Sequence, residues 1–275
     1  MSSVKQSPAR EEYISAIENN LFAWIPILGK LGRSYSSSPP GVDRSITDIP
    51  LALLNSVMNA RLTPAQADTA IDLIQKDGRA HHVPILWWIT PSTRPADLGK
   101  RLEDCGFAVE DDGPGMAVDL GNLGELPPTP AGFSIRLAEE DSSWRQWCIA
   151  MGWGFGGSPP DELFIRSWQS FVSTSASETV RPYTGWLNGQ PVATSLAFLA
   201  AGVAGIYCVA TVPEARRKGI AAYMTHHPLM YARCQGYDVG ILQSSAMGLG
   251  VYSSLGFREY CQVVSYRWQP ELPSG

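Results

Sequence analysis

The stretch TVPEARRKGIAAYMT, Thr211 to Thr225, decides the fold because it joins an apolar run to an expected helix through three consecutive cations. Arg216, Arg217 and Lys218 come directly before Gly219. A helix N-terminus has unpaired N–H groups and the positive end of the helix dipole, so it can hold a phosphate that small residues let approach. Cations at a helix start are unfavourable by the dipole argument alone. Their presence favours a bound anion over a solvated turn.

Two common phosphate sites do not fit this loop. The chain has no G-x-x-x-x-G-K-[ST] motif, and no G-x-G-x-x-G follows a strand. ATP and NAD are therefore disfavoured as ligands.

The elements on both sides of the loop form a regular series. Residues 181–212 hold three apolar runs, with a type I′ hairpin signal at Asn188-Gly189 and a further turn at Gly202, which predicts an antiparallel meander. A helix over 216–233, which Pro228 should kink, is expected next. A buried strand over 237–245, a short helix ending at Gly256 and a strand over 258–268 are expected after it.

The first half of the chain repeats the order of these elements. We expect a strand at 51–62, a helix at 63–78 begun by Thr63 and Pro64, a strand at 83–90, a helix at 95–107 and a strand at 114–120. Its junction ARLTPAQADTA lacks the cations and the glycine, and Leu102 stands where the second half has Tyr252. If either half does chemistry, it is the second.

The segment LGNLGELPPTPAGF, Leu120 to Phe133, separates the halves. It combines Gly and Pro with almost no periodicity, as a connection does. We therefore predict domains at 1–130 and 131–275.

The second half resembles the GNAT acyltransferase superfamily. RRKGIA matches its R/Q-x-x-G-x-G/A pattern between a strand and a helix, and YSSLGF is similar to its Y-x-x-x-G-F exit. With the Asn-Gly hairpin and the buried strand, the resemblance spans Phe133 to Trp268. It implies an α/β fold of two tandem GNAT-like units with mixed, mostly antiparallel sheets, the first unit being a degenerate copy without the cofactor loop.

The resemblance also implies a set of residues that bind acetyl-CoA as cosubstrate. Val209, Ala210 and Thr211 would hydrogen-bond the pantetheine arm through their backbone. Ser245 stands where many relatives have an asparagine, and Ala221 replaces the commoner final glycine. The diphosphate would be held by the loop and the helix start, with Arg216 as the first motif position: Arg216, Arg217, Lys218, Gly219, Ile220, Ala221 and Ala222.

Tyr252 falls where the family often has a tyrosine near the thioester sulfur, as the acid that protonates the departing thiolate. A phenol with a pKa near 10 can hydrogen-bond a developing thiolate. The alternative is a tyrosine that only packs against the core. An amine acceptor must also lose a proton, and Asp161, Glu162 and Glu214 are candidates for the base by position only.

The segment MGWGFGGSPPDE, Met151 to Glu162, has two interpretations. By the resemblance it lies at the acceptor wall, where its glycines and aromatic residues suit a mobile lid. It is equally consistent with an ordinary loop that has buried aromatic residues.

Composition restricts partners and compartment. The net charge of −5 disfavours duplex nucleic acid or an anionic membrane surface as the main partner. The five cysteines are scattered, without a C-x-x-C pair, which argues against a disulfide framework and a zinc site and favours a reducing cytoplasm. The N-terminus lacks a signal-peptide core, and no apolar run is long enough to span a bilayer. The pairs His81-His82 and His226-His227 are adjacent, so no metal site is expected.

By the resemblance, the second half passes an acetyl group from acetyl-CoA directly to a primary amine of a small molecule or peptide, as a monomer or homodimer. Two other classes stay open: a non-catalytic acyl-CoA sensor or interaction module, and a purely structural protein. The identity of the amine does not follow from the sequence.

Overall fold

The computed structural model describes residues 9–31, 33–35 and 41–271. Its backbone contacts divide the chain into two compact units whose segments interleave. Unit 1 consists of Met1–Leu21, Pro114–Asp161 and Ala176–Cys261, and unit 2 of Phe22–Gly113, Glu162–Ser175 and Gln262–Gly275. The division into 1–130 and 131–275 follows the order of elements along the sequence, and it stays a prediction.

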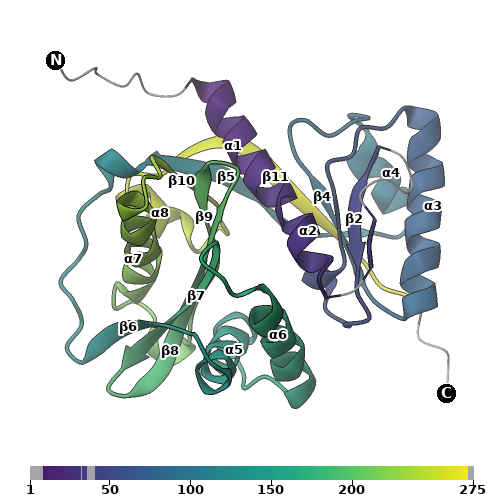
Figure 1. Ribbon diagram of the computed structural model, residues 1–275. Helices are drawn as coiled ribbons and strands as arrows, with labels where there is room; N and C mark the ends of the chain where they lie inside the picture. Colours follow the sequence, from purple (N-terminus) through teal and green to yellow (C-terminus); the bar gives the residue numbers. More distant parts are fainter. Residues whose placement is uncertain (1–8, 32, 36–40, 272–275) are drawn as a thin grey trace. The chain divides into compact units, whose positions relative to one another are not determined.

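Unit 1 contains a mostly antiparallel sheet with strand order β5-β10-β9-β8-β7-β6 (Figure 1). Its strands are β5 Ala108–Asp119, of which residues from Pro114 belong to this unit, β6 Phe133–Leu137, β7 Val180–Leu187, β8 Gln190–Ala200, β9 Val203–Thr211 and β10 Val239–Gln243. Its helices are α1 Arg10–Phe22, α5 Asp141–Gly156, α7 Ile220–Cys234 and α8 Leu249–Ser254, with 3₁₀ turns η2 Leu120–Asn122 and η3 Pro213–Ala215. The mixed α/β class expected from the sequence is confirmed.

The meander β7-β8-β9 forms as the sequence predicts. Asn188 and Gly189 have φ angles of 50° and 80°, which are the positive values that a type I′ turn requires. Ala201 and Gly202 make the second turn with φ angles of 52° and 76°. The two hairpins therefore follow directly from local turn chemistry.

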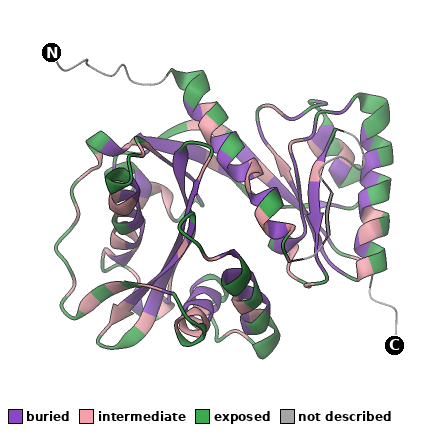
Figure 2. Cartoon of the chain, viewed as in Figure 1, coloured by how far each residue is buried: buried purple, intermediate pink, exposed green. Residues whose placement is uncertain are grey.

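Helices α5 and α7 cover opposite faces of this sheet. A Cβ at Gly185 on β7 would lie 2.7 Å from the sulfur of Met224 on α7. Ala210, Thr194 and Thr184 are paired across β9, β8 and β7, so their side chains lie on the same face of the sheet. Thr184 is next to Gly185 in β7, and successive residues of a strand point to opposite faces. Ala210 therefore lies on the face opposite to Met224. On that face, a Cβ at Gly154 of α5 would lie 2.7 Å from the Cβ of Ala210. The buried faces are purple in Figure 2.

Helix α1, which was not predicted from the sequence, packs in unit 1. The fully buried Asn20 side chain donates to the carbonyls of Phe198 (3.2 Å) and Ala200 (2.9 Å) and accepts from the Tyr207 hydroxyl (2.8 Å). Glycine at position 205 permits this approach, because a Cβ there would lie 2.1 Å from the Asn20 side-chain oxygen. An N-terminal helix is thus part of the unit that contains residues 216–219, the motif loop between η3 and α7.

Unit 2 contains strands in the order β1-β2-β3-β4-β11. They are β1 Arg33–Tyr35, β2 Asp43–Ile46, β3 Ser56–Met58, β4 Ile85–Ile89 and β11 Arg258–Trp268, of which residues from Gln262 belong to this unit. Its helices are α2 Trp24–Leu28, α3 Pro64–His81, α4 Leu98–Asp104 and α6 Glu162–Ser175, with the 3₁₀ turn η1 Ala52–Leu54. The buried residues Ile71 and Ile74 of α3 pack with Trp87 of β4 in one core.

The strand expected over 51–62 is much shorter in the structure. The buried Asn55 accepts from the Thr47 amide at 2.7 Å and donates to the carbonyls of Ile49 and Leu51 at 2.8 and 3.0 Å. These bonds hold the preceding residues in turns, so β3 begins only at Ser56.

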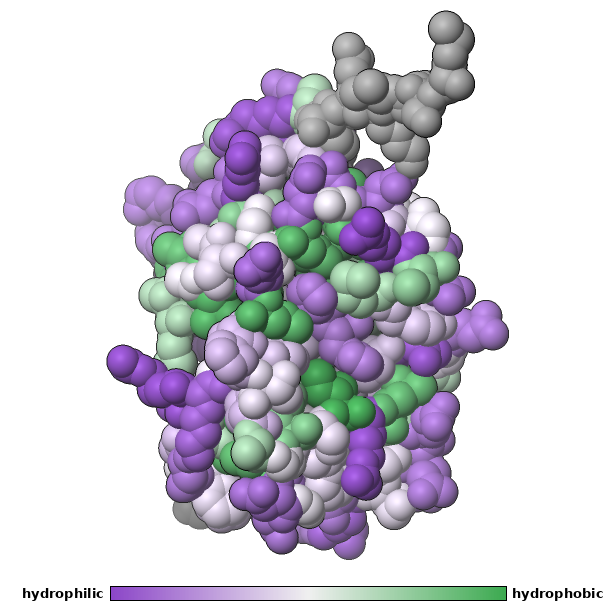
Figure 3. All heavy atoms as spheres, turned by 90° about the vertical axis from the view of Figure 1, so that its left-hand side faces the viewer, coloured by the Kyte–Doolittle hydropathy of each residue, from purple (hydrophilic) through white to green (hydrophobic). Residues whose placement is uncertain are grey.

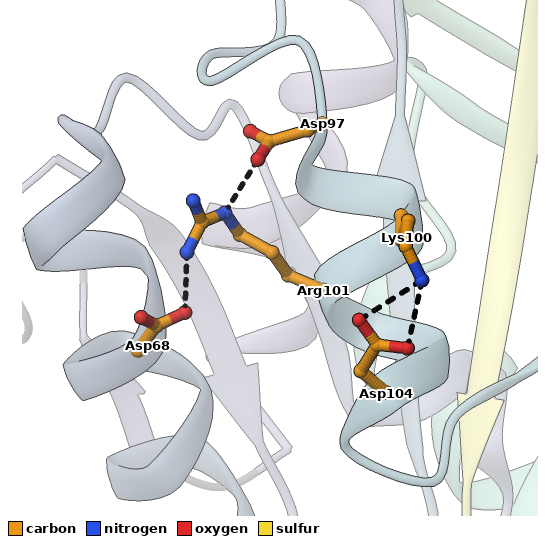
Figure 4. A network of polar contacts seen from close by, with 5 residues as sticks. All are labelled: Asp68, Asp97, Lys100, Arg101 and Asp104. Atoms are coloured by element: carbon orange, nitrogen blue, oxygen red, sulfur yellow. Dashed lines mark hydrogen bonds and ion pairs between the residues drawn. The ribbon is translucent and has the colours of Figure 1, made fainter.

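Charged contacts join the helices of unit 2. The Arg101 guanidinium of α4 lies between the carboxylates of Asp68 on α3 (2.8 Å) and Asp97 (2.9 Å), as Figure 4 shows. Lys100 pairs with Asp104 one turn further along α4 at 3.0 Å. All three acids are more than half exposed, so these pairs contribute little to stability.

The two halves of the sequence exchange strands. Residues 115–119 of β5, from the first half, pair antiparallel with β10 in unit 1. Residues 264–268 of β11, from the second half, pair antiparallel with β4 in unit 2. Each unit therefore contains a strand that the other half supplies, which hydrophobic periodicity does not reveal.

Candidate active site

The parallel strands β9 and β10 part at their C-terminal ends. They pair only through Ala204 with Gly240 and Gly205 with Ile241. Beyond this point β9 continues its ladder with β8 as far as Thr211, and β10 continues its ladder with β5 as far as Gln243. In these described strands, no ladder pair joins residues 206–211 to β10. The edge of β9 that faces β10 is therefore open to a ligand's hydrogen bonds.

A bulge in β9 accompanies the parting. Cys208 has a φ of 51°, and the register between β8 and β9 shifts between Thr194 and Leu196. A bulge bends its strand and increases the local twist. The Thr194 hydroxyl donates to the Cys208 carbonyl at 2.8 Å, which holds the distorted backbone. The sequence predicts a strand here and gives no sign of the bulge.

The thiols near this strand are not activated. Burial raises the pKa of Cys208 and that of Cys148 on α5 to about 12. A thiolate, not a thiol, is the nucleophile in covalent catalysis. Burial of these two thiols thus gives no support to a thiol intermediate.

The motif loop leaves the N-terminus of α7 open. The helix begins at Ile220, and not at Arg216 as predicted, because Gly219 takes a left-handed conformation with a φ of 74°. No side chain caps this end. Ala222 and Tyr223 donate the first bonds, both to the Gly219 carbonyl, so the N–H groups of Ile220 and Ala221 lie ahead of the helical ladder. Such a terminus is suited to an anion.

The predicted cations of the loop differ in their surroundings. Arg217 and Lys218 are exposed, and Arg217 has a φ of 63°. Arg216 is half-buried, and its guanidinium donates from Nε to the Thr211 carbonyl (3.0 Å) and from Nη2 to the Gly154 carbonyl (2.8 Å). A cofactor contact by any of the three stays a prediction.

The predicted pantetheine residues Val209, Ala210 and Thr211 occupy the parted end of β9. The hydroxyl oxygen of Thr211 is buried and has no hydrogen-bond partner. The side-chain amide nitrogen of Gln243, which ends β10, is also buried without a partner. Buried polar atoms are rarely left unsatisfied, so these two strand ends are suited to a polar ligand. Gln243 was not predicted from the sequence, where its signal is a polar residue closing a buried strand.

Tyr252 lies on α8 in the core of unit 1. Its ring centroid is 6.0 Å from that of Phe257, and only 8% of the residue is exposed. Glycine at position 248 accommodates the ring, because a Cβ there would lie 2.6 Å from it. Burial raises the Tyr252 pKa to about 12, so the hydroxyl is neutral at physiological pH. Its catalytic role stays a prediction.

Ser245 is exposed at the start of the turn into α8. Its hydroxyl accepts from the Gly248 amide at 3.3 Å. The side chain thus stabilises the turn, and a contact with the cofactor stays a prediction.

The candidates for the base lie in different places. Glu214 is exposed in η3, Asp161 ends a segment of unit 1, and Glu162 begins α6 of unit 2, where it accepts from Arg166 at 3.2 Å. A role as the base stays a prediction for each of the three.

The glycine-rich segment from Met151 is not a long lid. Residues up to Gly156 continue α5, and Gly157 ends that helix with a left-handed φ of 68°. Burial of the helix against β9 outweighs the low helix propensity of glycine. Both the lid and the loop interpretations were therefore wrong for the first half of this segment, residues 151–156.

Metal binding and membrane spanning find no support in the described part of the chain. No group of three or more His, Cys, Asp or Glu residues there has the geometry to hold a metal ion. Burial lowers the pKa of His226 and of His227. Among the described helices, none has the length and apolar character to cross a bilayer.

Hydrophobic residues also reach the surface on the side of unit 1 that carries α7. They form small patches separated by hydrophilic side chains (Figure 3). Such scattered patches are normal on protein surfaces and need no partner.

Comparison with known proteins agrees with this geometry. Residues 134–260 match the family model described as acetyltransferase (GNAT) domain. A search of the curated proteins found no match. The solved structure of a GCN5-related N-acetyltransferase from Kribbella flavida is similar, with a TM-score of 0.69 at 20% identity, covering 93% of this chain and 96% of that one.

Two further solved structures share the fold. A GCN5-related N-acetyltransferase from Sphaerobacter thermophilus has a TM-score of 0.60 at 19% identity, covering 84% of this chain and 77% of that one. A tandem GNAT protein from the clavulanic acid biosynthesis pathway has a TM-score of 0.54 at 12% identity, covering 95% and 97%. Residues 134–260 therefore match the model of a GNAT domain, and the chain has the fold of GNAT proteins, some of them tandem.

Proposed function

We propose that the chain is an acetyl-CoA-dependent N-acetyltransferase that acts on a primary amine of a small molecule or peptide. The observation that carries the proposal is the parting of β9 and β10 in front of the uncapped N-terminus of α7. The match of residues 134–260 to the model of a GNAT domain supports acyl transfer in general. The choice of acetyl-CoA and of an amine is our inference.

The residues of the opening fit this cosubstrate. The backbone of Val209, Ala210 and Thr211 would pair with the amides of the pantetheine arm. The N–H groups at the start of α7, with Arg217 and Lys218 nearby, would bind the diphosphate. The unpaired Thr211 hydroxyl provides a further polar group at the junction.

The reaction needs no covalent intermediate. The cosubstrate supplies the acetyl group as a thioester. The amine nitrogen attacks the carbonyl carbon, the C–S bond breaks, the sulfur leaves as a thiolate, and the nitrogen loses one proton to a base or to water. Because neither Cys148 nor Cys208 is activated, direct attack is the simpler route.

Tyr252 would donate a hydrogen bond to the departing sulfur. Its pKa of about 12 lies well above that of an alkyl thiol, about 8.5. Complete proton transfer from the phenol to the thiolate would therefore be uphill. Hydrogen-bond donation by a neutral phenol is the role that the burial of Tyr252 favours.

Cellular location and assembly are also proposals. The proposal of a reducing cytoplasm rests on the five scattered cysteines, which include no C-x-x-C pair. A monomer or a homodimer is consistent with the domain, and neither nucleic acid nor a membrane is proposed as a partner.

Two measurements test the proposal. Calorimetry should detect binding of CoA, and a thiol-release assay with acetyl-CoA and a panel of amines should detect turnover. Tyr252→Phe removes a hydrogen-bond donor to the departing sulfur, so it should lower kcat about a hundredfold and leave CoA affinity unchanged. Binding without turnover for any amine would favour the acyl-CoA sensor, and absence of binding would favour a structural role.

A further inference from the structure

The side chain of Arg216 connects two elements of unit 1. Its Nε donates to the carbonyl of Thr211, at the end of β9, and its Nη2 donates to the carbonyl of Gly154, in the last turn of α5. The distances are 3.0 and 2.8 Å. One guanidinium thus binds a strand end and a helix end at once.

Both acceptors suit a guanidinium. The last carbonyls of a helix have no intrahelical partner and carry the negative end of its dipole. The helix end also lies unusually close to the strand: a Cβ at Gly154 would be 2.7 Å from the Cβ of Ala210 and 3.1 Å from the Thr211 nitrogen. Glycine at position 154 permits this close approach, and the two hydrogen bonds of Arg216 hold the helix end and the strand end together.

The two following cations have different surroundings. Arg217 and Lys218 are exposed, whereas Arg216 is half-buried and directs two donors at backbone carbonyls. A guanidinium has a fixed planar fork, so donors held by these carbonyls do not reorient toward a ligand.

We propose that Arg216 is a positioning residue that fixes the end of α5 against the end of β9. It acts on cofactor binding through the backbone of Thr211 and the loop to Gly219, without contacting the diphosphate. The identity of the ligand in this proposal rests on the proposed function above. The bridge between α5 and β9 does not.

The first test needs no ligand. Amide hydrogen exchange of the full chain should become about tenfold faster in residues 153–157 when Arg216→Lys or Arg216→Gln removes the fork. Lysine keeps the positive charge but lacks the planar fork of donors, so Arg216→Lys shows whether the fork or only the charge is needed. The matched control Lys218→Gln should leave this segment unchanged. Unchanged exchange in both Arg216 variants overturns the bridge.

The second test titrates CoA by calorimetry at low and at high salt. Arg216→Lys and Arg216→Gln should each weaken binding about tenfold at both salt concentrations, because a displaced backbone is not restored by screening. Arg217→Gln and Lys218→Gln should weaken binding at low salt and approach the wild type at high salt.

The outcomes separate this proposal from the proposed function. If Arg216→Lys binds CoA like the wild type and the loss in Arg216→Gln vanishes at high salt, Arg216 contacts a phosphate and the positioning role is wrong. If the wild type does not bind CoA, the proposed function fails, and hydrogen exchange alone decides whether Arg216 holds α5 to β9.

Discussion

Helices α3 and α7 occupy the same place in the order of elements of the two halves, yet their N-termini differ. At α3, the Thr63 hydroxyl accepts from the Gln66 amide (3.4 Å), and the Gln66 side chain accepts from the Thr63 amide (2.9 Å). At α7, Gly219 provides no side-chain cap, and two exposed cations precede it. The first helix satisfies its own terminus, whereas the second leaves N–H groups available.

The comparison separates what the fold requires from what a ligand requires. A helix can start after a strand with an ordinary capping box, as Thr63 to Gln66 show. The glycine and the cations of the α7 loop are therefore not needed to begin a helix. The charge difference lies ahead of the helix: neither first turn contains an acidic residue, but Arg217 and Lys218 precede α7.

The largest expected effect comes from Gly219→Val. Valine at a φ of 74° is strained, and its Cβ would meet the ring of Pro127 at 2.8 Å. We expect CoA affinity, measured by calorimetry, to fall at least about a hundredfold, because the side chain also covers the open N–H groups.

Gly202→Val is the matched control for that prediction. Gly202 has a φ of 76°, and a Cβ there would have nothing within 4 Å, so it has similar backbone strain without the contact. Both variants should lose about 1–3 kcal/mol in the free energy of unfolding. Equal CoA affinity in the two variants would contradict the placement of the diphosphate.

The next prediction concerns α4 and α8, where the fully buried Leu102 corresponds to Tyr252. The Tyr252 pKa is raised from 10.0 to about 12 in the folded chain. Because the folded chain favours the neutral phenol, Tyr252 contributes to the free energy of unfolding fully below pH 10, and this contribution is lost as the pH rises toward 12. Over that window the wild type should lose about 1.4 kcal/mol per pH unit through this group.

Denaturant unfolding of Tyr252→Phe between pH 9 and 12 checks this expectation. Phenylalanine cannot ionise, so the free energy of unfolding should fall less steeply above pH 10 than in the wild type. Cys148 and Cys208, whose pKa values are also raised by burial, contribute equally to both proteins. Parallel curves would mean that Tyr252 ionises freely in the folded chain.

The sequence predicted the parts of the fold that local chemistry determines. Asn188-Gly189 fixed a hairpin through its positive φ angles, and Thr63 and Pro64 fixed the start of α3. The motif loop was located because cations before a glycine are unusual at a helix start. In each case, neighbouring residues carry the whole signal.

The parts that were missed depend on distant residues. The bulge at Cys208 is held by the Thr194 hydroxyl across the strand pair, and α1 is placed by Asn20 on backbone groups about 180 positions away. The pairing of β5 with β10 and of β11 with β4 is non-local as well. Hydrophobic periodicity shows which face of a strand is buried, but it does not show which other strand it pairs with. The pair of hydrogen bonds that Arg216 donates is also non-local, since one acceptor, Gly154, is 62 positions from it.

A smaller effect is expected at the N-terminus of α3, which has a side-chain cap. Thr63→Ala removes the cap of α3, which should lower the free energy of unfolding by about 1 kcal/mol. Thr63→Ser keeps a hydroxyl and should retain most of that stability. CoA affinity should be unchanged in both variants, and a loss in Thr63→Ala would show that the two termini are not independent.

The smallest effect concerns the support that α7 has in place of a cap. The Tyr223 hydroxyl, in the first turn of α7, donates to the Pro127 carbonyl and lies equally close to the Thr129 hydroxyl, both at 2.6 Å. Tyr223→Phe removes these exposed bonds and keeps the ring contact with Phe133, so we expect a loss of only about 0.5 kcal/mol. Hydrogen exchange in residues 123–132 should become faster while that of α7 stays constant, with Thr129→Val giving a weaker form of the same change. Faster exchange within α7 itself would mean that residues 123–132 cap the helix. The two helices would then differ only in which residues cap them.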